Sequence, residues 1–299
     1  MQAIKAKNIS KSFGITKAVN NISFNVASGE IVGLLGPNGA GKTTTIRMIL
    51  DIFKPDTGSI SVLGGPMNET KKNQIGYLPE ERGLYQDITL DQCLSYLASL
   101  KGLGTKDIKD RLETYLDSFD LLDYRFKKVK EMSKGLQQKA QLITAFIHLP
   151  KLVIVDEPFS ALDPVNTQMA KDLLREERAN GTAIVMSTHQ MNQAEELCDR
   201  ILLIHKGQIV LKGKLDEIKS KFAKQEILVK AVSALPLKIE GVDFVEPENQ
   251  HHRLYIKEGV AAKDILADLV KKGIELERFE IEQPSLDEIF IQTVTGKVG

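Results

Sequence analysis

The sequence predicts an α/β domain built on a parallel β-sheet, followed by a small α+β domain. Three apolar runs, GEIVGLLG, LVIVD and TAIVMST, occupy residues 29–36, 152–156 and 182–188 and do not alternate with polar residues. Such runs are typical of strands buried on both faces, as in a parallel sheet covered by helices. Segments with helical periodicity lie between these runs. The alternation of strands and helices therefore predicts the α/β class.

Further elements are expected around this sheet. Ile22, Phe24 and Val26 alternate with polar residues, which predicts a strand with one wet face in an antiparallel β subdomain. Apolar residues recur at helical spacing across residues 87–131, so this segment is expected to form an inserted helical subdomain. Residues 200–213 predict a β-hairpin that closes the first domain near residue 214.

A domain boundary is expected at residue 214. Residues 215–225 are interpreted as a polar helical linker, and residues 226–299 as a small α+β accessory domain in which strand patterns flank one helix. Residues 1–214 carry 28 basic and 24 acidic side chains, and the rest carry 12 and 16. The resulting net charges, +4 and −4, have opposite signs and support the boundary.

Composition narrows the classes of function. The 299-residue chain has 40 basic and 40 acidic side chains, so no overall positive field attracts nucleic acid, and no nucleic-acid partner is expected. Cys93 and Cys198 lie far apart in sequence, which does not favour a disulfide frame or a zinc site. No signal segment opens the sequence, and no apolar run approaches the ~20 residues that span a bilayer. Any membrane role is therefore expected to come through a partner.

The segment GPNGAGKTT, Gly36–Thr44, predicts a phosphate-binding loop because it follows a buried strand and precedes a helix. Gly39 and Gly41 let the backbone turn its N–H groups toward phosphate oxygens at a helix N-terminus. Lys42 supplies a positive charge for the β- and γ-phosphates, and the Thr43 hydroxyl is placed to bind Mg²⁺. The alternative is a structural glycine-rich turn. The G-x-G-x-x-G pattern of a dinucleotide fold does not follow the strand.

Two adjacent carboxylates end the apolar run at residues 152–156. Ligands bind at the carboxyl edge of open α/β sheets, which is where Asp156 and Glu157 are expected to lie. Asp156 is interpreted as a partner of Mg²⁺, and Glu157 as the general base that polarises a water for in-line attack on the γ-phosphorus. The alternative is a solvated strand end without a chemical role.

These motifs, in this order, resemble those of the ATP-binding subunits of ATP-binding cassette (ABC) transporters, and the resemblance covers residues 2–214. It implies the P-loop NTPase fold of an ABC-type nucleotide-binding domain. It implies that His189, in STH, is the switch histidine, which makes it catalytic beside Glu157 and Lys42. It also assigns Asp163, in SALD, to the D-loop. The nucleotide-binding residues that it implies, with Phe13 stacked on adenine, are Phe13, Val19, Gly36, Asn38, Gly39, Gly41, Lys42, Thr43 and Thr44.

The segment MSKGLQQK, residues 132–139, lies where the family places its signature loop. Read alone, it is an ordinary helix start with a solvated face. The resemblance implies that Ser133 and Gly135 contact the ATP held by a partner subunit. Lys134 replaces a glycine of the common signature, and the lysine either reaches a phosphate or points into water.

The segment GYLPEERGLY, residues 76–85, occupies the position of the Q-loop, and Glu80 stands where the family usually has glutamine. A carboxylate at this position can still bind Mg²⁺, directly or through water, although it adds negative charge beside an anionic nucleotide. The alternative is that Glu80 and Glu81 form a solvated pair in a loop that senses a partner.

The resemblance implies an ATPase subunit that uses ATP and Mg²⁺ and drives transport, with export favoured. The variant motifs and the extension ending in QPSLDEIF are similar to the branch of NatA-type sodium-exporter and drug-exporter ATPases. The family pairs two ATPase subunits, here as a homodimer or a heterodimer, and docks them on a separate membrane permease. The expected location is cytoplasmic, peripheral on the inner face of the cell membrane. A non-transport or a regulatory ABC ATPase is the alternative, and the transported substrate is not specified by the sequence.

Overall fold

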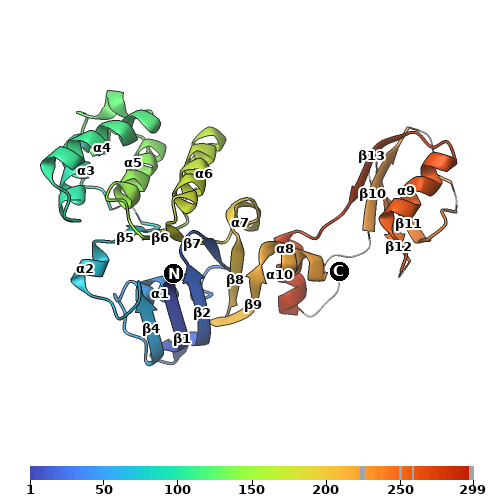
Figure 1. Ribbon diagram of the computed structural model, residues 1–299, viewed down its shortest axis with the longest axis horizontal. Helices are drawn as coiled ribbons and strands as arrows, with labels where there is room; N and C mark the ends of the chain where they lie inside the picture. The colour runs from blue at the N-terminus through green and yellow to red at the C-terminus, as the bar shows by residue number, and fades with distance from the viewer. Residues whose placement is uncertain are drawn as a thin grey trace. The chain divides into compact units, whose positions relative to one another are not determined.

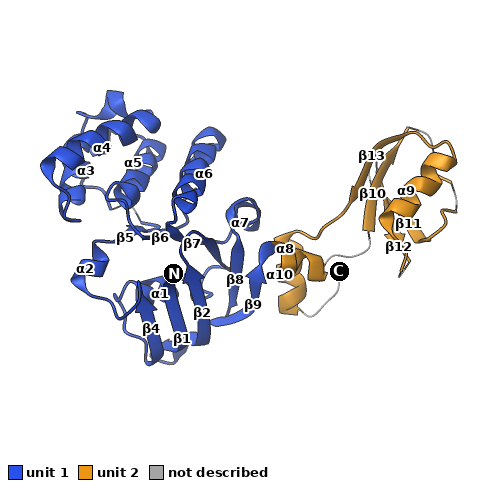
Figure 2. Cartoon of the chain, viewed as in Figure 1, with its two compact units in different colours: residues 1–215 blue, residues 216–299 orange. Residues whose placement is uncertain are grey.

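The computed structural model describes residues 1–81, 83–222, 226–232, 234–236, 238–248, 251–257 and 259–295. The chain divides into two compact units, residues 1–215 and 216–299 (Figure 2). Residue 82 of the expected Q-loop, residues 223–225 of the expected linker, and residues 233, 237, 249, 250, 258 and 296–299 of the expected accessory domain lie outside the described residues. Within the described part of the chain, no helix is long and apolar enough to cross a membrane.

The first unit contains two β-sheets (Figure 1). An antiparallel sheet has the strand order β2-β1-β4, and a six-stranded sheet has the order β5-β6-β7-β3-β8-β9. Their strands are β1 (Gln2–Phe13), β2 (Thr16–Ala27), β3 (Ile31–Leu35), β4 (Thr57–Val62), β5 (Ile75–Leu78), β6 (Leu152–Asp156), β7 (Ala183–Thr188), β8 (Arg200–His205) and β9 (Gln208–Lys214). The first five strands of the second sheet are parallel, and β9 pairs antiparallel with β8.

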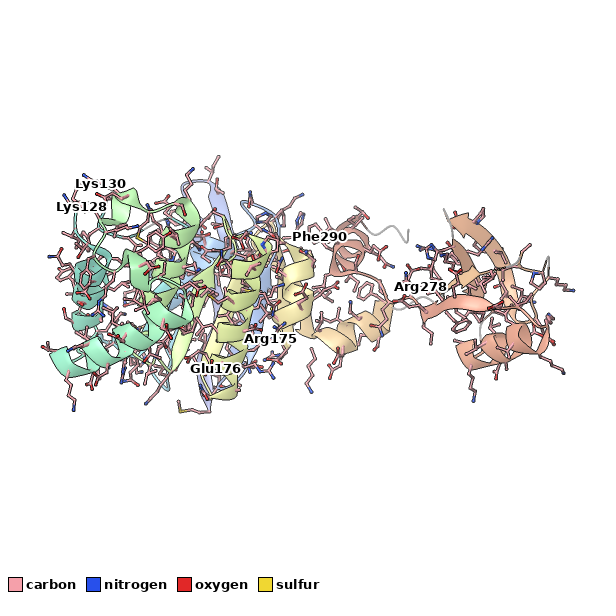
Figure 3. The ribbon with its side chains drawn as sticks, turned by 90° about the horizontal axis from the view of Figure 1, so that it is seen from above. Lys128, Lys130, Arg175, Glu176, Arg278 and Phe290 are labelled. Carbon is pink, nitrogen blue, oxygen red and sulfur yellow. The ribbon has the colours of Figure 1, made fainter. Side chains whose placement is uncertain are left out.

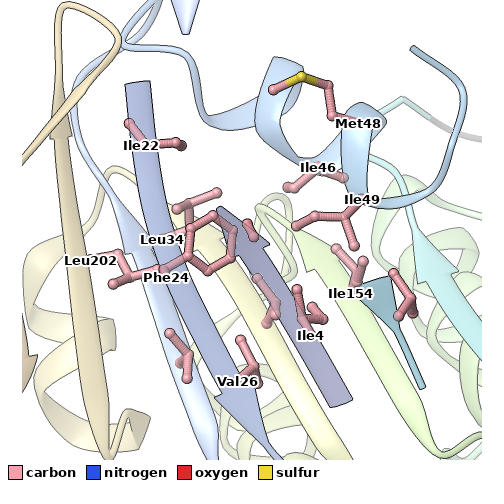
Figure 4. Packing of buried hydrophobic residues seen from close by; sticks show 14 of the residues in the cluster. Ile4, Ile22, Phe24, Val26, Leu34, Ile46, Met48, Ile49, Ile154 and Leu202 are labelled. Carbon is pink, nitrogen blue, oxygen red and sulfur yellow. The ribbon is translucent and has the colours of Figure 1, made fainter. Parts of the chain in front are cut away.

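The antiparallel sheet packs one face into the main core. Ile22, Phe24 and Val26 of β2 are buried, as their alternation predicts. They join a cluster that includes Ile46 and Ile49 of helix α1 (Lys42–Ile49) and apolar residues of the parallel sheet (Figure 4). The cluster packs α1 between the two sheets. The start of this helix follows the glycine-rich loop and is therefore held by packing on two sides.

Parallel pairing brings three strand ends together. All residues of β3, β6 and β7 are buried, which confirms the interpretation of the apolar runs. In the register of the sheet, Leu35 of β3 pairs with Thr188 of β7, and Asp156 of β6 pairs with Ser187 of β7. The segments that leave these strands therefore start side by side at one edge of the sheet.

The region expected to be helical throughout residues 87–131 is divided into shorter pieces. It contains α3 (Leu90–Ser99), α4 (Thr105–Ser118) and two 3₁₀ turns, Leu122–Tyr124 and Val129–Glu131. Gly102 has φ +86° and Asp120 has φ +52°, and both left-handed residues follow the end of a helix. Helix α5 (Lys134–Phe146) completes this subdomain, and its side chains pack against α3 and β5. The remaining helices of the unit are α2 (Glu69–Lys72), α6 (Pro164–Ala179) and α7 (Met191–Leu197).

The second unit contains an antiparallel sheet of order β11-β12-β10-β13 with one helix packed on it. Ile227, Val229 and Leu254 of this sheet are buried against Ile265 and Leu269 of α9. Helix α10 was not expected from the sequence, although Ser285 and Glu288 form a reciprocal capping pair at its start. The elements of this unit are α8 (Leu215–Phe222, whose first residue belongs to unit 1), β10 (Glu226–Ala231), β11 (Val242–Glu248), β12 (His251–Ile256), α9 (Ala262–Lys271), β13 (Leu276–Ile281) and α10 (Leu286–Thr295).

A buried histidine lies at the base of the helical subdomain. His148 follows α5 and is 8% exposed. Burial lowers the pKa of His148 from 6.5 to about 4, and the nearby charges of Lys101 and Arg111 act in the same direction. The unfolded chain therefore binds a proton at a higher pH than the folded chain. The stability contributed by neutral His148 is complete above pH 6.5 and is lost as the pH falls toward 4.

The variant His148→Leu tests this linkage because it removes the titrating ring and keeps an apolar side chain of similar size. Between pH 7.5 and pH 5.0, the free energy of unfolding of the wild type is expected to fall by about 2 kcal/mol more than that of the variant. Urea denaturation at the two pH values measures both losses. An equal fall in the free energy of unfolding of the two proteins would contradict the lowered pKa of His148.

Candidate active site

The glycine-rich loop connects β3 to α1 and wraps around its own lysine. The Lys42 ammonium donates hydrogen bonds to the carbonyl oxygens of Gly36 at 2.7 Å and Pro37 at 3.2 Å. Lys42 is only 7% exposed. The loop thus holds the Lys42 charge at the N-terminus of α1, where the helix dipole is also positive.

A glycine is required where the loop enters the helix. Gly41 has φ +111°, and a Cβ atom at this position would lie 2.4 Å from the carbonyl oxygen of Ala18. Gly39 also has a positive φ, +76°, but nothing lies within 4 Å of the position that its Cβ would take. Gly41 is therefore restricted both by its backbone conformation and by close packing against β2. Gly39 is restricted by its backbone conformation alone.

Three carboxylates surround the Lys42 ammonium. Burial lowers the pKa of Lys42, while the negative charges of Glu157, Asp156 and Glu80 act against this shift. The pKa of Asp156 is raised, chiefly by burial, and hydrogen bonds from neighbouring hydroxyls partly oppose the shift. The Thr43 hydroxyl lies 3.3 Å from Asp156 Oδ2. The site thus combines a buried cation with closely spaced oxygen atoms that can bind a cation.

Glu157 is held by the end of the neighbouring strand β7. The Thr188 hydroxyl donates to Glu157 Oε2 at 3.0 Å, and the backbone N–H of His189 donates to Oε1 at 3.0 Å. His189 Nδ1 lies 2.7 Å from the same Oε1. Glu157 is 8% exposed and has φ +48°, a left-handed conformation that is uncommon for this residue type. Its carboxylate is therefore fixed in one orientation by β7 and the segment after it.

Most of the site residues expected from the sequence meet around one cavity of about 260 Å³. Glu80 is among them and is exposed, as is Glu81. Ala18 also lines the cavity and was missed, because an alanine in a strand carries no chemical signal. The lining residues are Ala18, Asn38, Gly39, Gly41, Lys42, Thr43, Thr44, Glu80, Asp156 and Glu157.

Three expected nucleotide contacts, Phe13, Val19 and Gly36, do not line this cavity. The carbonyl oxygen of Gly36 instead accepts a hydrogen bond from Lys42. Phe13, at the end of β1, is 46% exposed, and its ring packs edge to face on Phe53 with 5.3 Å between centroids. The exposed face of Phe13 can still receive a planar ring. Val19 is only 1% exposed and belongs to the hydrophobic core. Val19 therefore supports the position of its neighbour Ala18 and presents no surface of its own.

The signature and D-loop residues lie outside the cavity, each at a helix start. The Ser133 hydroxyl accepts a hydrogen bond from Leu136 N at 3.3 Å and caps α5. The Asp163 carboxylate accepts from Asn166 N at 2.9 Å and caps α6. The Cβ position of Gly135 lies 3.4 Å from the carbonyl oxygen of Ala161, so the signature adjoins the D-loop. Lys134, the first residue of α5, is exposed.

Comparisons with protein families cover most of the chain. The family described as ABC transporter matches residues 19–160. A second family, described as the C-terminal domain of DrrA1-3-like ATP-binding proteins, matches residues 213–294. A solved structure, described as that of the ATP binding subunit of an ABC transporter, superimposes with a TM-score of 0.70 at 35% identity and covers 74% of this chain and 93% of its own.

Curated relatives span both units. The uncharacterized ABC transporter ATP-binding protein YhaQ of Bacillus subtilis is 42% identical over 289 residues, which cover 96% of this chain and 97% of YhaQ. The linearmycin resistance ATP-binding protein LnrL of the same organism is 30% identical over 308 residues, 98% of each chain. The ABC transporter ATP-binding protein NatA, also from B. subtilis, is 35% identical over 208 residues, 68% of this chain and 85% of NatA.

Fold and site define a phosphate-loop hydrolase of nucleoside triphosphates. The chain belongs to the family of ABC transporter ATP-binding proteins, as the sequence predicts, and it is an ATP-binding subunit with ATPase activity. NatA is among its relatives, and the second unit corresponds to the C-terminal extension of DrrA-like proteins. Subunits of this family dimerise and work with transmembrane permease subunits.

Alanine at Gly41 is expected to destabilise the first unit more than alanine at Gly39. Both substitutions place a side chain at positive φ, which costs about 1–2 kcal/mol. Only Gly41→Ala also forces a contact with the backbone of β2, and overpacking of this kind adds about 1–3 kcal/mol. Urea unfolding of the two variants without nucleotide measures the difference. Equal losses would show that the Ala18 contact does not constrain the loop.

Proposed function

We propose that this chain binds Mg²⁺-ATP in the cavity around Lys42 and hydrolyses it with Glu157 as the general base, in order to drive export through a separate permease. The observation that carries the proposal is the buried Glu157 carboxylate, held by Thr188 and His189 beside the phosphate-binding loop. A carboxylate fixed in this way is available as a proton acceptor and cannot rotate away.

The loop and the N-terminus of α1 bind the triphosphate. Gly39 and Gly41 let backbone N–H groups face the phosphates, and Lys42 exchanges its two carbonyl partners for β- and γ-phosphate oxygens. The Thr43 hydroxyl and the carboxylates of Asp156 and Glu80 form the hard oxygen set that suits Mg²⁺. When bound, this ion neutralises charge that develops on the phosphate oxygens.

Glu157 accepts a proton from the attacking water. The water oxygen then bonds to the γ-phosphorus, and the bond from that phosphorus to the bridging oxygen of ADP breaks. His189, which adjoins the Glu157 carboxylate through Nδ1, keeps this base oriented and presents its other ring nitrogen to the γ-phosphate. The 2.7 Å contact between the two side chains makes them one functional unit.

A second subunit completes each site. The N-terminus of α5, with Ser133 and Gly135, is an exposed helix start that suits the γ-phosphate of ATP held by the facing subunit. Asp163 of the D-loop then lies at the interface between the subunits. ATP at the interface favours the dimer, and hydrolysis releases it. A homodimer and a heterodimer both fit this arrangement.

The permease contact is proposed at an aromatic surface formed by the end of the Q-loop and α3. Tyr85 and Tyr96 are 50% and 48% exposed and pack edge to face at 5.6 Å. Leu100, at the end of α3, is 57% exposed. An exposed apolar surface of this kind is typical of a protein contact. The permease would hold the chain at the inner face of the membrane. The name of a relative, the Nod factor export ATP-binding protein I of a Rhizobium species, supports export as the direction.

The variant Glu157→Gln is expected to bind ATP normally and to hydrolyse it about 10²- to 10⁴-fold more slowly, because an amide cannot accept the proton. It should accumulate as a dimer with ATP in size-exclusion chromatography. The exposed Glu176→Gln, on α6 (Figure 3), is the control and should match the wild type. Turnover near the wild-type rate in folded Glu157→Gln would remove Glu157 from its role.

The variants Glu80→Gln and Glu81→Gln form a matched pair that tests the unusual Q-loop. Glu80 lines the cavity, whereas Glu81 offers its backbone carbonyl to Gln141 at 3.1 Å. Glu80→Gln should raise the Mg²⁺ concentration for half-maximal ATPase activity about 10-fold, the usual effect of removing a supporting carboxylate. Glu81→Gln should leave it unchanged. Magnesium titrations of the ATPase activity of both variants measure these concentrations. Identical curves would show that Glu80 has no role in magnesium binding.

A further inference from the structure

A buried lysine on α6 joins two segments near the Glu157–His189 pair. Lys171 is only 5% exposed. Its ammonium pairs with the carboxylate of Glu196 on α7 and lies 5.9 Å from the ring centroid of Phe159. A buried ammonium with a carboxylate on one side and an aromatic face on the other has a single preferred position. Lys171 therefore fixes the distance between Phe159 and α7.

One partner of Lys171, Phe159, is close in sequence to Glu157, and the other, Glu196, lies near the end of the helix that follows His189. Phe159 is two residues beyond Glu157, and α7 begins two residues beyond His189. A second cation on α6, Arg175 (Figure 3), donates to the carbonyl oxygen of Glu196 at 3.5 Å. Cations at the end of a helix stabilise its C-terminal turn. Helix α6 therefore holds α7 through both the side chain and the backbone carbonyl of Glu196.

Lys171 also reaches the segment that faces a partner subunit in the proposed dimer. Phe159 leads into the D-loop, Ser160–Asp163, and a cavity of about 490 Å³ lies between this loop and the start of α7. Lys171 and Gln190, the residue after His189, both line this cavity. A displacement of the D-loop therefore reaches the His189 segment through Lys171.

We propose that Lys171 is a positioning residue for ATP hydrolysis, which keeps His189 in contact with Glu157 and transmits contact at the D-loop to that pair. The inference rests on the proposed function, because it acts through Glu157 and His189. Lys171 touches neither of them in the structure and lines a cavity separate from the nucleotide site. Its effect is therefore expected on turnover and not on nucleotide affinity.

The variant Lys171→Met tests the proposal in the full-length chain. Methionine keeps the buried stem and removes the charge, and Glu196, with a side chain that is 51% exposed, remains solvated, so the fold should tolerate the change. Turnover should fall about 10- to 100-fold, the usual effect of a small misplacement of catalytic groups. Affinity for a fluorescent ATP analogue should stay within about 2-fold of the wild type. Glu196→Gln should act in the same direction.

The control is Arg200→Met, which removes the cation of another partly buried ion pair, 3.0 Å from Glu30 in the same unit. It should lower the thermal midpoint while turnover remains that of the wild type. Wild-type turnover in Lys171→Met, or a loss of turnover accompanied by an equal loss of ATP affinity, would overturn the positioning role.

A double-mutant cycle separates this inference from the proposed function. If Lys171 acts through His189, adding Lys171→Met to His189→Ala causes no further loss of turnover. If His189→Ala is impaired and Lys171→Met adds its full loss to it, the inference fails while the proposed function stands. If Glu157→Gln and His189→Ala both turn over ATP at the wild-type rate, the proposed function itself fails.

Discussion

Backbone hydrogen bonds between β3, β6 and β7 determine where three chemically different segments meet. A phosphate-binding loop follows β3, a pair of carboxylates lies at the end of β6, and β7 ends with the Thr188 hydroxyl and is followed by the His189 imidazole. None of these segments is close to the others in sequence. Parallel pairing in one register brings them to the same edge of the sheet, and the cavity forms there because the loop turns back over that edge. A shift of this register would separate Glu157 from His189.

Charge balance in the cavity depends on this convergence. The Lys42 ammonium is buried, which disfavours its charge and lowers its pKa, and the negative charges of Glu157, Asp156 and Glu80 oppose this effect in part. A bound triphosphate would add negative charge to that of the three carboxylates. A bound cation would then have to balance Glu80 in addition to Asp156 and Glu157. In the proposed function, Glu80 therefore links the negative charge of the site to its need for Mg²⁺, and the Q-loop contributes to the electrostatics of the site.

The sequence predicts the parts of the site that follow from chain order and residue chemistry. Apolar runs, the loop pattern and the carboxylate pair lead to Lys42, Asp156 and Glu157 because each motif lies directly at a strand end. The place of Ala18 in the cavity lining and the burial of Val19 depend on which face of β2 packs against the loop. The alternation of polar and apolar residues does not specify that face. The bridge from Lys171 to Glu196 depends on the packing of α6 beside α7, which has no local signal.

The left-handed backbone of Glu157 has a consequence for damaged or partly loosened subunits. A non-glycine residue in this conformation costs on the order of 1–3 kcal/mol and persists only where its surroundings enforce it. Here the Glu157 N–H donates to Ser187 O at 2.9 Å, and the Thr188 hydroxyl and the His189 N–H donate to the Glu157 carboxylate. Local loosening of β7 would therefore free the Glu157 backbone to leave the left-handed conformation and would turn the proposed base away from His189.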